Sequence, residues 1–113
     1  MQLILSVRFY CSTTGNELVK DWLKDQVSVG ARKAIGVDIK TVQFGWPIGM
    51  PVVRKMGTNL WEVRSHIPEG IARVLFTVVG TEMVLLHGFV KKSRDTPKVD
   101  LDLSFARMKE VKK

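Results

Sequence analysis

Hydrophobic and polar residues alternate along three consecutive segments in the second half of the chain. These segments cover residues 60–67, 71–79 and 82–92, and all three are rich in β-branched or aromatic residues. Two short sequences suited to tight turns separate them, Pro68-Glu69-Gly70 and Gly80-Thr81. The pattern therefore predicts three strands joined by hairpins, which together make an antiparallel meander.

The two faces of the predicted meander differ in chemistry, because side chains alternate between the faces of a strand. One face is nearly all apolar and collects Trp61, Val63, Ala72, Val74, Phe76, Val78, Val84, Leu86 and Val90. The other face mixes charged, polar and apolar residues and collects Leu60, Glu62, Arg64, His66, Ile71, Arg73, Leu75, Leu85, His87, Phe89 and Lys91. We therefore expect three neighbouring strands to place cations on the face opposite the core.

The first half of the chain predicts a strand and two helices. Residues 3–10 are rich in Leu, Ile, Val and aromatic residues, as strands are. Thr14 and Glu17 have the spacing of a capping box, which predicts a helix over residues 16–26. A second helix is predicted over residues 28–44, with an apolar stripe of Ala31, Ala34, Ile35, Ile39 and Val42.

The remaining segments complete an α+β fold. Residues 45–51 contain two glycines and two prolines, which do not fit a helix, and they therefore predict a loop. A short strand is predicted to follow over residues 52–56. Thr96-Pro97 supplies an N-cap and a first-turn proline for a last helix, whose buried stripe would be Leu101, Phe105 and Met108. The predicted order is β-α-α, then an antiparallel β-meander, then a C-terminal helix.

Length and composition predict one domain over residues 1–113. The chain is 45% hydrophobic and long enough to bury a core without disulfides. No apolar run approaches the roughly 20 residues that cross a bilayer, so no membrane span is expected. The single cysteine, Cys11, excludes an internal disulfide and favours a reducing compartment. We expect a cytoplasmic protein.

The charge distribution favours a partner that carries phosphates, or an acidic protein. The formal net charge is +7, from 18 Lys and Arg against 11 Asp and Glu. Residues 54–98 alone hold eight basic and four acidic side chains. The basic excess therefore belongs to the same region as the predicted meander.

The candidate chemistry is one that needs cations and a proton carrier only. The chain has no metal-ligand spacing of the HxxxH or CxxC kind and no Gly-rich phosphate loop after a strand, so neither metal nor cofactor is expected. Cleavage of RNA by its own 2′-hydroxyl requires a base, donors for the charged phosphorane and an acid. Arg64 and Arg73 suit the phosphate role, and Phe89 could stack an unpaired base. The candidates for proton transfer are His87, Lys91 and Lys55.

Several of these motifs, in this order, resemble the phage-derived, HigB-like branch of the RelE toxin superfamily. They are Leu60-Trp61-Glu62-Val63-Arg64, Arg73-Val74-Leu75-Phe76, Leu85-Leu86-His87-Gly88-Phe89-Val90-Lys91-Lys92 and Thr96-Pro97. The resemblance implies the toxin of a type II toxin–antitoxin pair, a metal-independent endoribonuclease that cleaves mRNA on the translating ribosome. It also implies a cognate antitoxin, usually with a helix-turn-helix domain.

The resemblance also implies roles for individual residues. Arg64 and Arg73 occupy positions of phosphate-contacting arginines, Lys55 matches a lysine ahead of the LWELR-type strand, and Lys91-Lys92 match a lysine pair. The catalytic candidates are thus Arg64, Arg73, His87 and Lys91, and the RNA-binding candidates are Arg54, Lys55, Phe89, Lys92 and Arg94. The chain departs from the family in residues 106–113, which lack the tyrosine or histidine of several members. The acid and the base therefore stay open.

Alternative interpretations concern both the protein and its residues. A toxin of the same fold could inhibit DNA gyrase by binding alone, or the chain could be a silent basic module for RNA or the antitoxin. Arg64 and Glu62 could form an exposed ion pair of little energetic value. His87 could be a hydrogen-bonded structural histidine as readily as a catalytic one.

Overall fold

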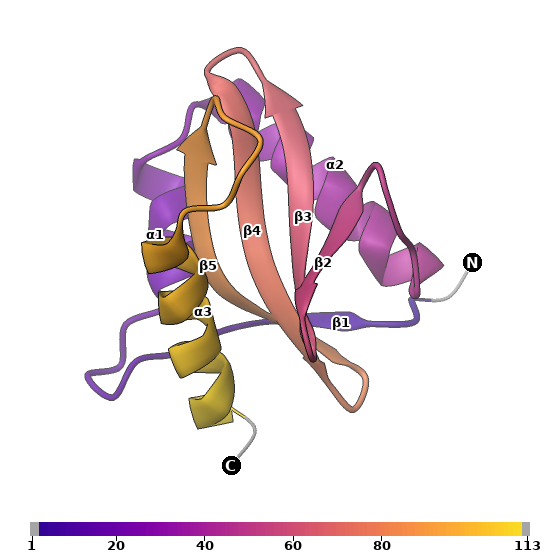
Figure 1. Ribbon diagram of the computed structural model, residues 1–113, viewed down its shortest axis with the longest axis vertical. Coiled ribbons are helices and arrows are strands. Elements are labelled where there is room, and N and C mark those ends of the chain that lie inside the picture. The colour runs from indigo at the N-terminus through magenta and orange to yellow at the C-terminus, as the bar shows by residue number, and fades with distance from the viewer. Residues whose placement is uncertain (1–2, 112–113) are drawn as a thin grey trace.

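The computed structural model describes residues 3–111 and contains, within them, the elements that the sequence predicts. They are β1 (Ser6–Phe9), α1 (Leu18–Asp25), α2 (Val29–Gly45), β2 (Val53–Gly57), β3 (Leu60–Ile67), β4 (Gly70–Val79), β5 (Glu82–Lys91) and α3 (Lys98–Val111) (Figure 1). The α+β order of strand, two helices, meander and final helix is confirmed.

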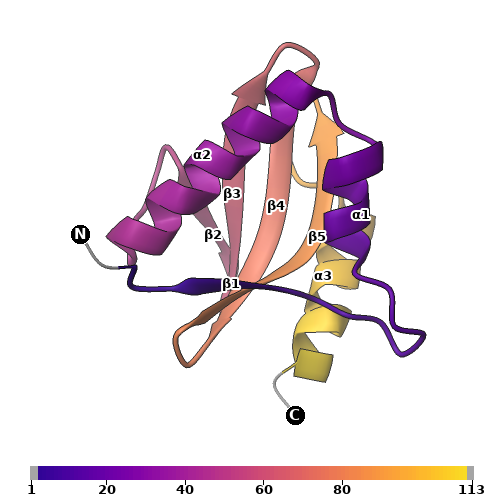
Figure 2. The ribbon, with the colours of Figure 1, turned by 180° about the vertical axis from the view of Figure 1, so that it is seen from behind.

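The strands form one mixed sheet in the order β1-β5-β4-β3-β2. The four strands from β2 to β5 are antiparallel neighbours, and β1 pairs in parallel with β5. Figures 1 and 2 show α1 and α2 on one face of this sheet and α3 on the other. The loop of residues 92–97, which joins β5 to α3, passes in front of β4 on the α3 side (Figure 1).

Both faces of the sheet carry an apolar cluster. On the α1/α2 side, Ile35, Ile39 and Val42 of α2 pack with strand residues that include Val63 and Phe76. On the α3 side a second cluster gathers Tyr10, Leu60, Leu75, Val84, Leu86 and Met108. The expectation of a core on one face only is therefore wrong, because α3 and its apolar stripe cover part of the charged face.

An irregularity in the pairing of β4 with β5 explains a second correction. Leu75 pairs with His87 but Phe76 pairs with Leu85, so Leu86 is an extra residue in β5. Such a bulge reverses the alternation of side chains on one side of it. As a result Val84 and Leu86 lie in the cluster on the α3 side and Leu85 in the cluster on the α1/α2 side, opposite to the predicted faces.

The helix starts differ from two of the predicted caps. The first residue of α1 is Leu18, and no side chain caps it, because Thr14 interacts instead with Ser12 and Asn16. The capping box is therefore wrong. Thr96 does not cap α3 either, since its hydroxyl donates to the carboxylate of Glu62.

The start of α2 shows the expected chemistry. The Ser28 hydroxyl accepts a hydrogen bond of 3.2 Å from the backbone N–H of Ala31, which satisfies a free donor of the first turn. Of the predicted stripe, Ala31, Ile35, Ile39 and Val42 are buried and Ala34 is partly buried.

Candidate functional site

The register of the strands brings the predicted charged residues onto the face that α3 partly covers. Residues directly opposite one another on paired strands point to the same side of the sheet. The paired rows across β3, β4 and β5 are Glu62–Leu75–His87, Arg64–Arg73–Phe89 and His66–Ile71–Lys91. Arg54 of β2 pairs with Glu62 and joins this face. The prediction of cations from neighbouring strands on one face is confirmed.

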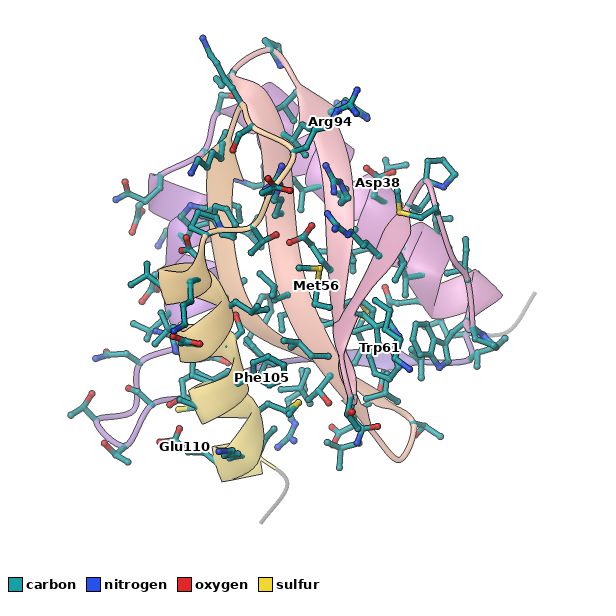
Figure 3. The ribbon with its side chains drawn as sticks, viewed as in Figure 1. Asp38, Met56, Trp61, Arg94, Phe105 and Glu110 are labelled. Carbon is teal, nitrogen blue, oxygen red and sulfur yellow. The ribbon has the colours of Figure 1, made fainter. Side chains whose placement is uncertain are left out.

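A cleft of about 370 Å³ opens on this face beside the loop of residues 92–97. Its lining consists of Met50, Pro51, Arg54, Arg64, His66, Ile71 and Arg94. The three arginines come from β2, β3 and the loop, and Arg94 is labelled in Figure 3. The lining holds no carboxylate, so the cleft presents guanidinium groups, an exposed imidazole and some apolar surface to a ligand.

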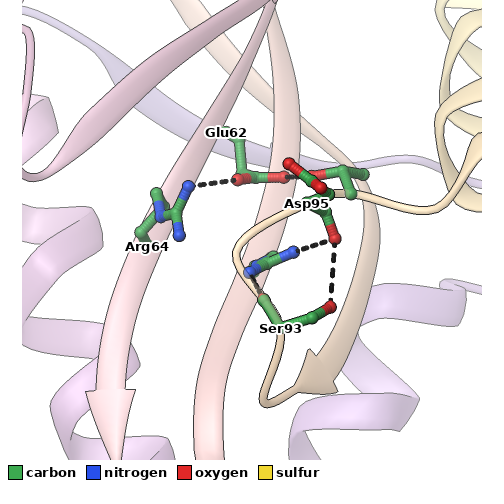
Figure 4. Close-up of polar contacts among 6 residues, drawn as sticks. Glu62, Arg64, Ser93 and Asp95 are labelled. Carbon is green, nitrogen blue, oxygen red and sulfur yellow. Dashed lines mark hydrogen bonds and ion pairs between the residues drawn. The ribbon is translucent and has the colours of Figure 1, made fainter.

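Arg73 lies beneath the loop and does not line the cleft. Its side chain is fully buried, Nη1 donates to the carbonyl of Asp95 at 2.7 Å, and Nη2 donates to the carbonyl of Ser93 (Figure 4). The guanidinium also lies 5.9 Å from the ring centroid of Phe89. Arg73 thus binds the backbone on both sides of Arg94 and holds that residue at the edge of the cleft.

Glu62 is a buried carboxylate that interacts with two arginines, with Arg64 through an ion pair and with Arg73 through its charge. One oxygen, Oε2, accepts a hydrogen bond of 2.5 Å from the Thr96 hydroxyl, and the other, Oε1, lies 3.8 Å from Arg64 Nη1 (Figure 4). The side chain of Glu62 is 0% exposed and that of Arg64 11%. The interpretation of Arg64 and Glu62 as an exposed ion pair is therefore wrong, because both side chains are largely removed from water.

Burial and charge act on Arg73 in opposite directions. Removal from water lowers its pKa, and the negative charge of Glu62 raises it again. Arginine keeps its proton in proteins, so Arg73 is a buried cation that depends on Glu62 for compensation. We conclude that Glu62, Arg73 and the loop form one polar unit under the cleft.

His87 lies away from the cleft, at the junction of β5 and α3. Its Nε2 is 2.7 Å from Asp100 Oδ1, and its ring stacks on Phe89 with centroids 5.5 Å apart. The imidazole borders a separate hollow of about 210 Å³ that Trp22 and Arg107 also line. His87 therefore joins the first turn of α3 to the sheet. The ring of Phe89 contacts both His87 and Arg73.

The predicted lysines do not gather at one place. Lys55 pairs with Trp61, which puts it on the face opposite to Arg54 and outside the cleft. Lys91 is exposed and pairs with Ile71, which lines the cleft. Lys92 follows the end of β5 and is exposed. Of the predicted RNA-binding residues, Arg54 and Arg94 line the cleft.

Among the polar residues that line the cleft, His66 is the one that was not a candidate from the sequence. It follows Arg64 by two positions in β3, so alternation alone places both side chains on one face. That signal was present in the sequence. The other missed partner is Asp100, whose contact with His87 joins residues 13 positions apart across a loop and could not be read from spacing.

Within residues 3–111, no three or more His, Cys, Asp and Glu side chains come together as a metal site would require. No helix in that range is long and apolar enough to cross a membrane.

Comparison with known proteins identifies the family. No curated protein sequence matches the chain. A family model described as Phage derived protein Gp49-like (DUF891) matches residues 21–109, from α1 to α3, and so includes every residue of the cleft. This family is part of the RelE/HigB-like group of toxins from toxin–antitoxin systems. The chain therefore belongs to the Phage derived protein Gp49-like family of toxins.

Proposed function

We propose that this protein is a toxin that cleaves mRNA on the translating ribosome, by attack of a 2′-hydroxyl and without metal. The observation that carries the proposal is the cleft, in which Arg54, Arg64 and Arg94 converge with His66 and no carboxylate. Arginine donates two parallel hydrogen bonds to a phosphate, and such donors stabilise the charge that develops in phosphoryl transfer. Family membership implies an antitoxin partner, which we propose to be a helix-turn-helix protein.

The residues take three roles in this proposal, which are phosphate contact, proton transfer and support of the surrounding structure. Arg64 contacts the scissile phosphate, because it lines the cleft two positions from His66 on the same face of β3. His66 is the first candidate for proton transfer, since its imidazole is exposed there, and Lys91, in the same row across Ile71, is the second. Arg73 acts as a positioning residue for the loop that carries Arg94. His87 supports α3 and takes no part in proton transfer.

Mapping mRNA 5′ ends after induction tests the proposal. We expect new ends inside translated regions within minutes of induction, with DNA supercoiling unchanged, because the cleft suits RNA phosphates and a gyrase inhibitor needs no such donors. Intact translated transcripts during growth arrest would contradict the nuclease, and loss of supercoiling activity would then favour gyrase inhibition. A protein that is harmless when expressed would favour the silent RNA- or antitoxin-binding module.

The salt dependence of RNA binding tests the cleft itself. Each phosphate contact to a single strand contributes roughly 0.7 to the slope of log affinity against log salt concentration, so replacing Arg54 and Arg94 with serine should reduce that slope by roughly 1.4. Fluorescence anisotropy with a labelled single-stranded RNA measures it. The matched control replaces Lys33 and Lys40, two exposed cations of α2. An equal reduction in both double variants would mean that the cleft is not the RNA site.

A further inference from the structure

A second hollow lies on the opposite side of the sheet, between α1 and α2. Figure 2 shows the two helices diverging from their connection, with β1 crossing the open end. The groove has a volume of about 440 Å³ and is lined by Val7, Phe9, Lys20, Leu23, Lys24, Arg32, Ile35, Gly36, Ile39 and Leu85. None of these residues belongs to the cationic cleft.

The groove is held open by a contact at the end where the helices meet. Arg32 of α2 donates from Nε to the carbonyl of Leu23 at 2.8 Å and from Nη2 to the carbonyl of Lys24 at 3.0 Å. These bonds satisfy two carbonyls in the last turn of α1, which otherwise have no partner within the helix. The bonds fasten the end of α1 to the start of α2, so the divergence of the two helices is built into the fold.

The chemistry of the groove is apolar below and cationic at the rim. Ile35, Ile39 and Leu85 belong to the core cluster, and Val7 and Phe9 of the edge strand β1 are only partly buried beside them. Lys20, Lys24 and Arg32 are exposed and the lining contains no carboxylate. An amphipathic helix with an apolar stripe between acidic flanks complements both features.

Two other occupants fit the groove less well. Nucleic-acid interfaces are strongly polar, whereas most residues in this lining are apolar. An added strand would pair with the free edge of β1, but β1 has only four residues, and most of the residues that line the groove belong to α1 and α2. The balance of an apolar floor and a basic rim favours a helix.

We propose that the groove between α1 and α2 docks an acidic amphipathic helix of the antitoxin, and that this docking leaves the cationic cleft open. The identity of the partner rests on the proposed function; the chemistry of the groove does not. Because the groove and the cleft lie on opposite faces of the sheet, a helix in the groove touches none of the cleft arginines. Neutralisation of the toxin would then need a second antitoxin segment or exclusion of the ribosome by bulk.

Gly36 offers a way to fill the groove without disturbing the fold. It lines the groove from α2, and a Cβ atom at this position has no neighbour within 4 Å. A Cβ atom at Gly30, in the first turn of the same helix, also has no neighbour within 4 Å, but Gly30 does not line the groove. Tryptophan is a better helix residue than glycine, so neither G36W nor G30W should weaken α2.

The probe is a synthetic, fluorescein-labelled amphipathic helical peptide with leucines along one face and glutamates on both flanks. We expect it to bind the full chain in fluorescence anisotropy, and we expect G36W, but not G30W, to weaken binding by about tenfold or more. A peptide with lysines in place of the glutamates should bind far more weakly. The double variant K20E/K24E should lose the glutamate peptide, whereas K33E/K40E keeps it.

Three results of the peptide experiment would contradict the proposed docking site. Failure of the glutamate peptide to bind, equal binding by G36W and wild type, or a preference for the lysine peptide would each remove the groove as an acidic-helix site. Labelled single-stranded RNA separates this test from that of the proposed function: RNA affinity should fall in the Arg54 and Arg94 double variant and stay unchanged in G36W. Peptide binding without RNA binding would leave the groove intact and contradict the cleft alone.

Discussion

Replacement of Arg73 by methionine is expected to lower the free energy of unfolding by roughly 3–5 kcal/mol, the usual cost of removing one partner from a buried ion pair. The guanidinium is fully buried, and its loss leaves the carbonyls of Ser93 and Asp95 without their donors. It also leaves the buried carboxylate of Glu62 without one of its cations. Urea denaturation followed by circular dichroism measures the change.

Two companion variants separate the buried charge from the loop contacts. Arg94→Met changes an exposed arginine of the same loop and should alter stability by less than about 0.5 kcal/mol. Adding Glu62→Gln to Arg73→Met removes the uncompensated charge, so the double variant should be less destabilised than the sum of the single variants. A stability of Arg73→Met equal to wild type would show that the guanidinium does not support the loop. Because Arg73 supports the fold, a loss of toxicity in an Arg73 variant is interpretable only after the folded fraction of that variant has been measured.

The elements of the meander could be predicted well because their signals are local. Alternation gave β3 at its observed bounds and β4 to within one residue, and Gly80 adopts the positive φ of 61° that the predicted hairpin requires. The bulge in β5 could not be seen, because Leu85 and Leu86 are both apolar and either could face a core. The second apolar cluster, which α3 covers, allows leucines to be buried on both faces of β5.

The candidate site was predictable in its charges but not in its exposure. Strand alternation correctly placed Arg64, His66 and Arg73 on one face. What the sequence could not show is which of them the loop covers, since the bonds from Arg73 reach residues 20 and 22 positions further along the chain. A contact of the same long-range kind explains Thr96, whose hydroxyl donates to the carboxylate of Glu62 and does not cap α3. Contacts made across loops therefore decide whether an arginine lines the cleft, as Arg64 does, or lies buried beneath the loop, as Arg73 does.

Replacement of His66 by alanine is expected to reduce the cleavage rate of ribosome-bound mRNA by about 10²–10⁴-fold, the usual contribution of one general acid or base. The imidazole is exposed and lines the cleft, two positions from Arg64 on the same strand face, so it faces the cleft in which we propose that the RNA binds. RNA affinity should change little, because the three arginines remain. Single-turnover cleavage and RNA binding, measured on the same preparation, separate the two effects.

His87→Ala is the matched control, since His87 is the other histidine of the chain. Its contact with Asp100 at 2.7 Å holds α3 to β5, so its loss should lower stability by about 0.5–3 kcal/mol and leave the cleavage rate per folded molecule nearly unchanged. Added imidazole should restore part of the rate of His66→Ala and none in His87→Ala. The reverse pattern, a slow His87→Ala and a normal His66→Ala, would move the proton carrier to the hollow beside Trp22 and Arg107. If neither substitution slows cleavage, Lys91 becomes the carrier to test, because it is the remaining titratable side chain in the row that ends at the cleft.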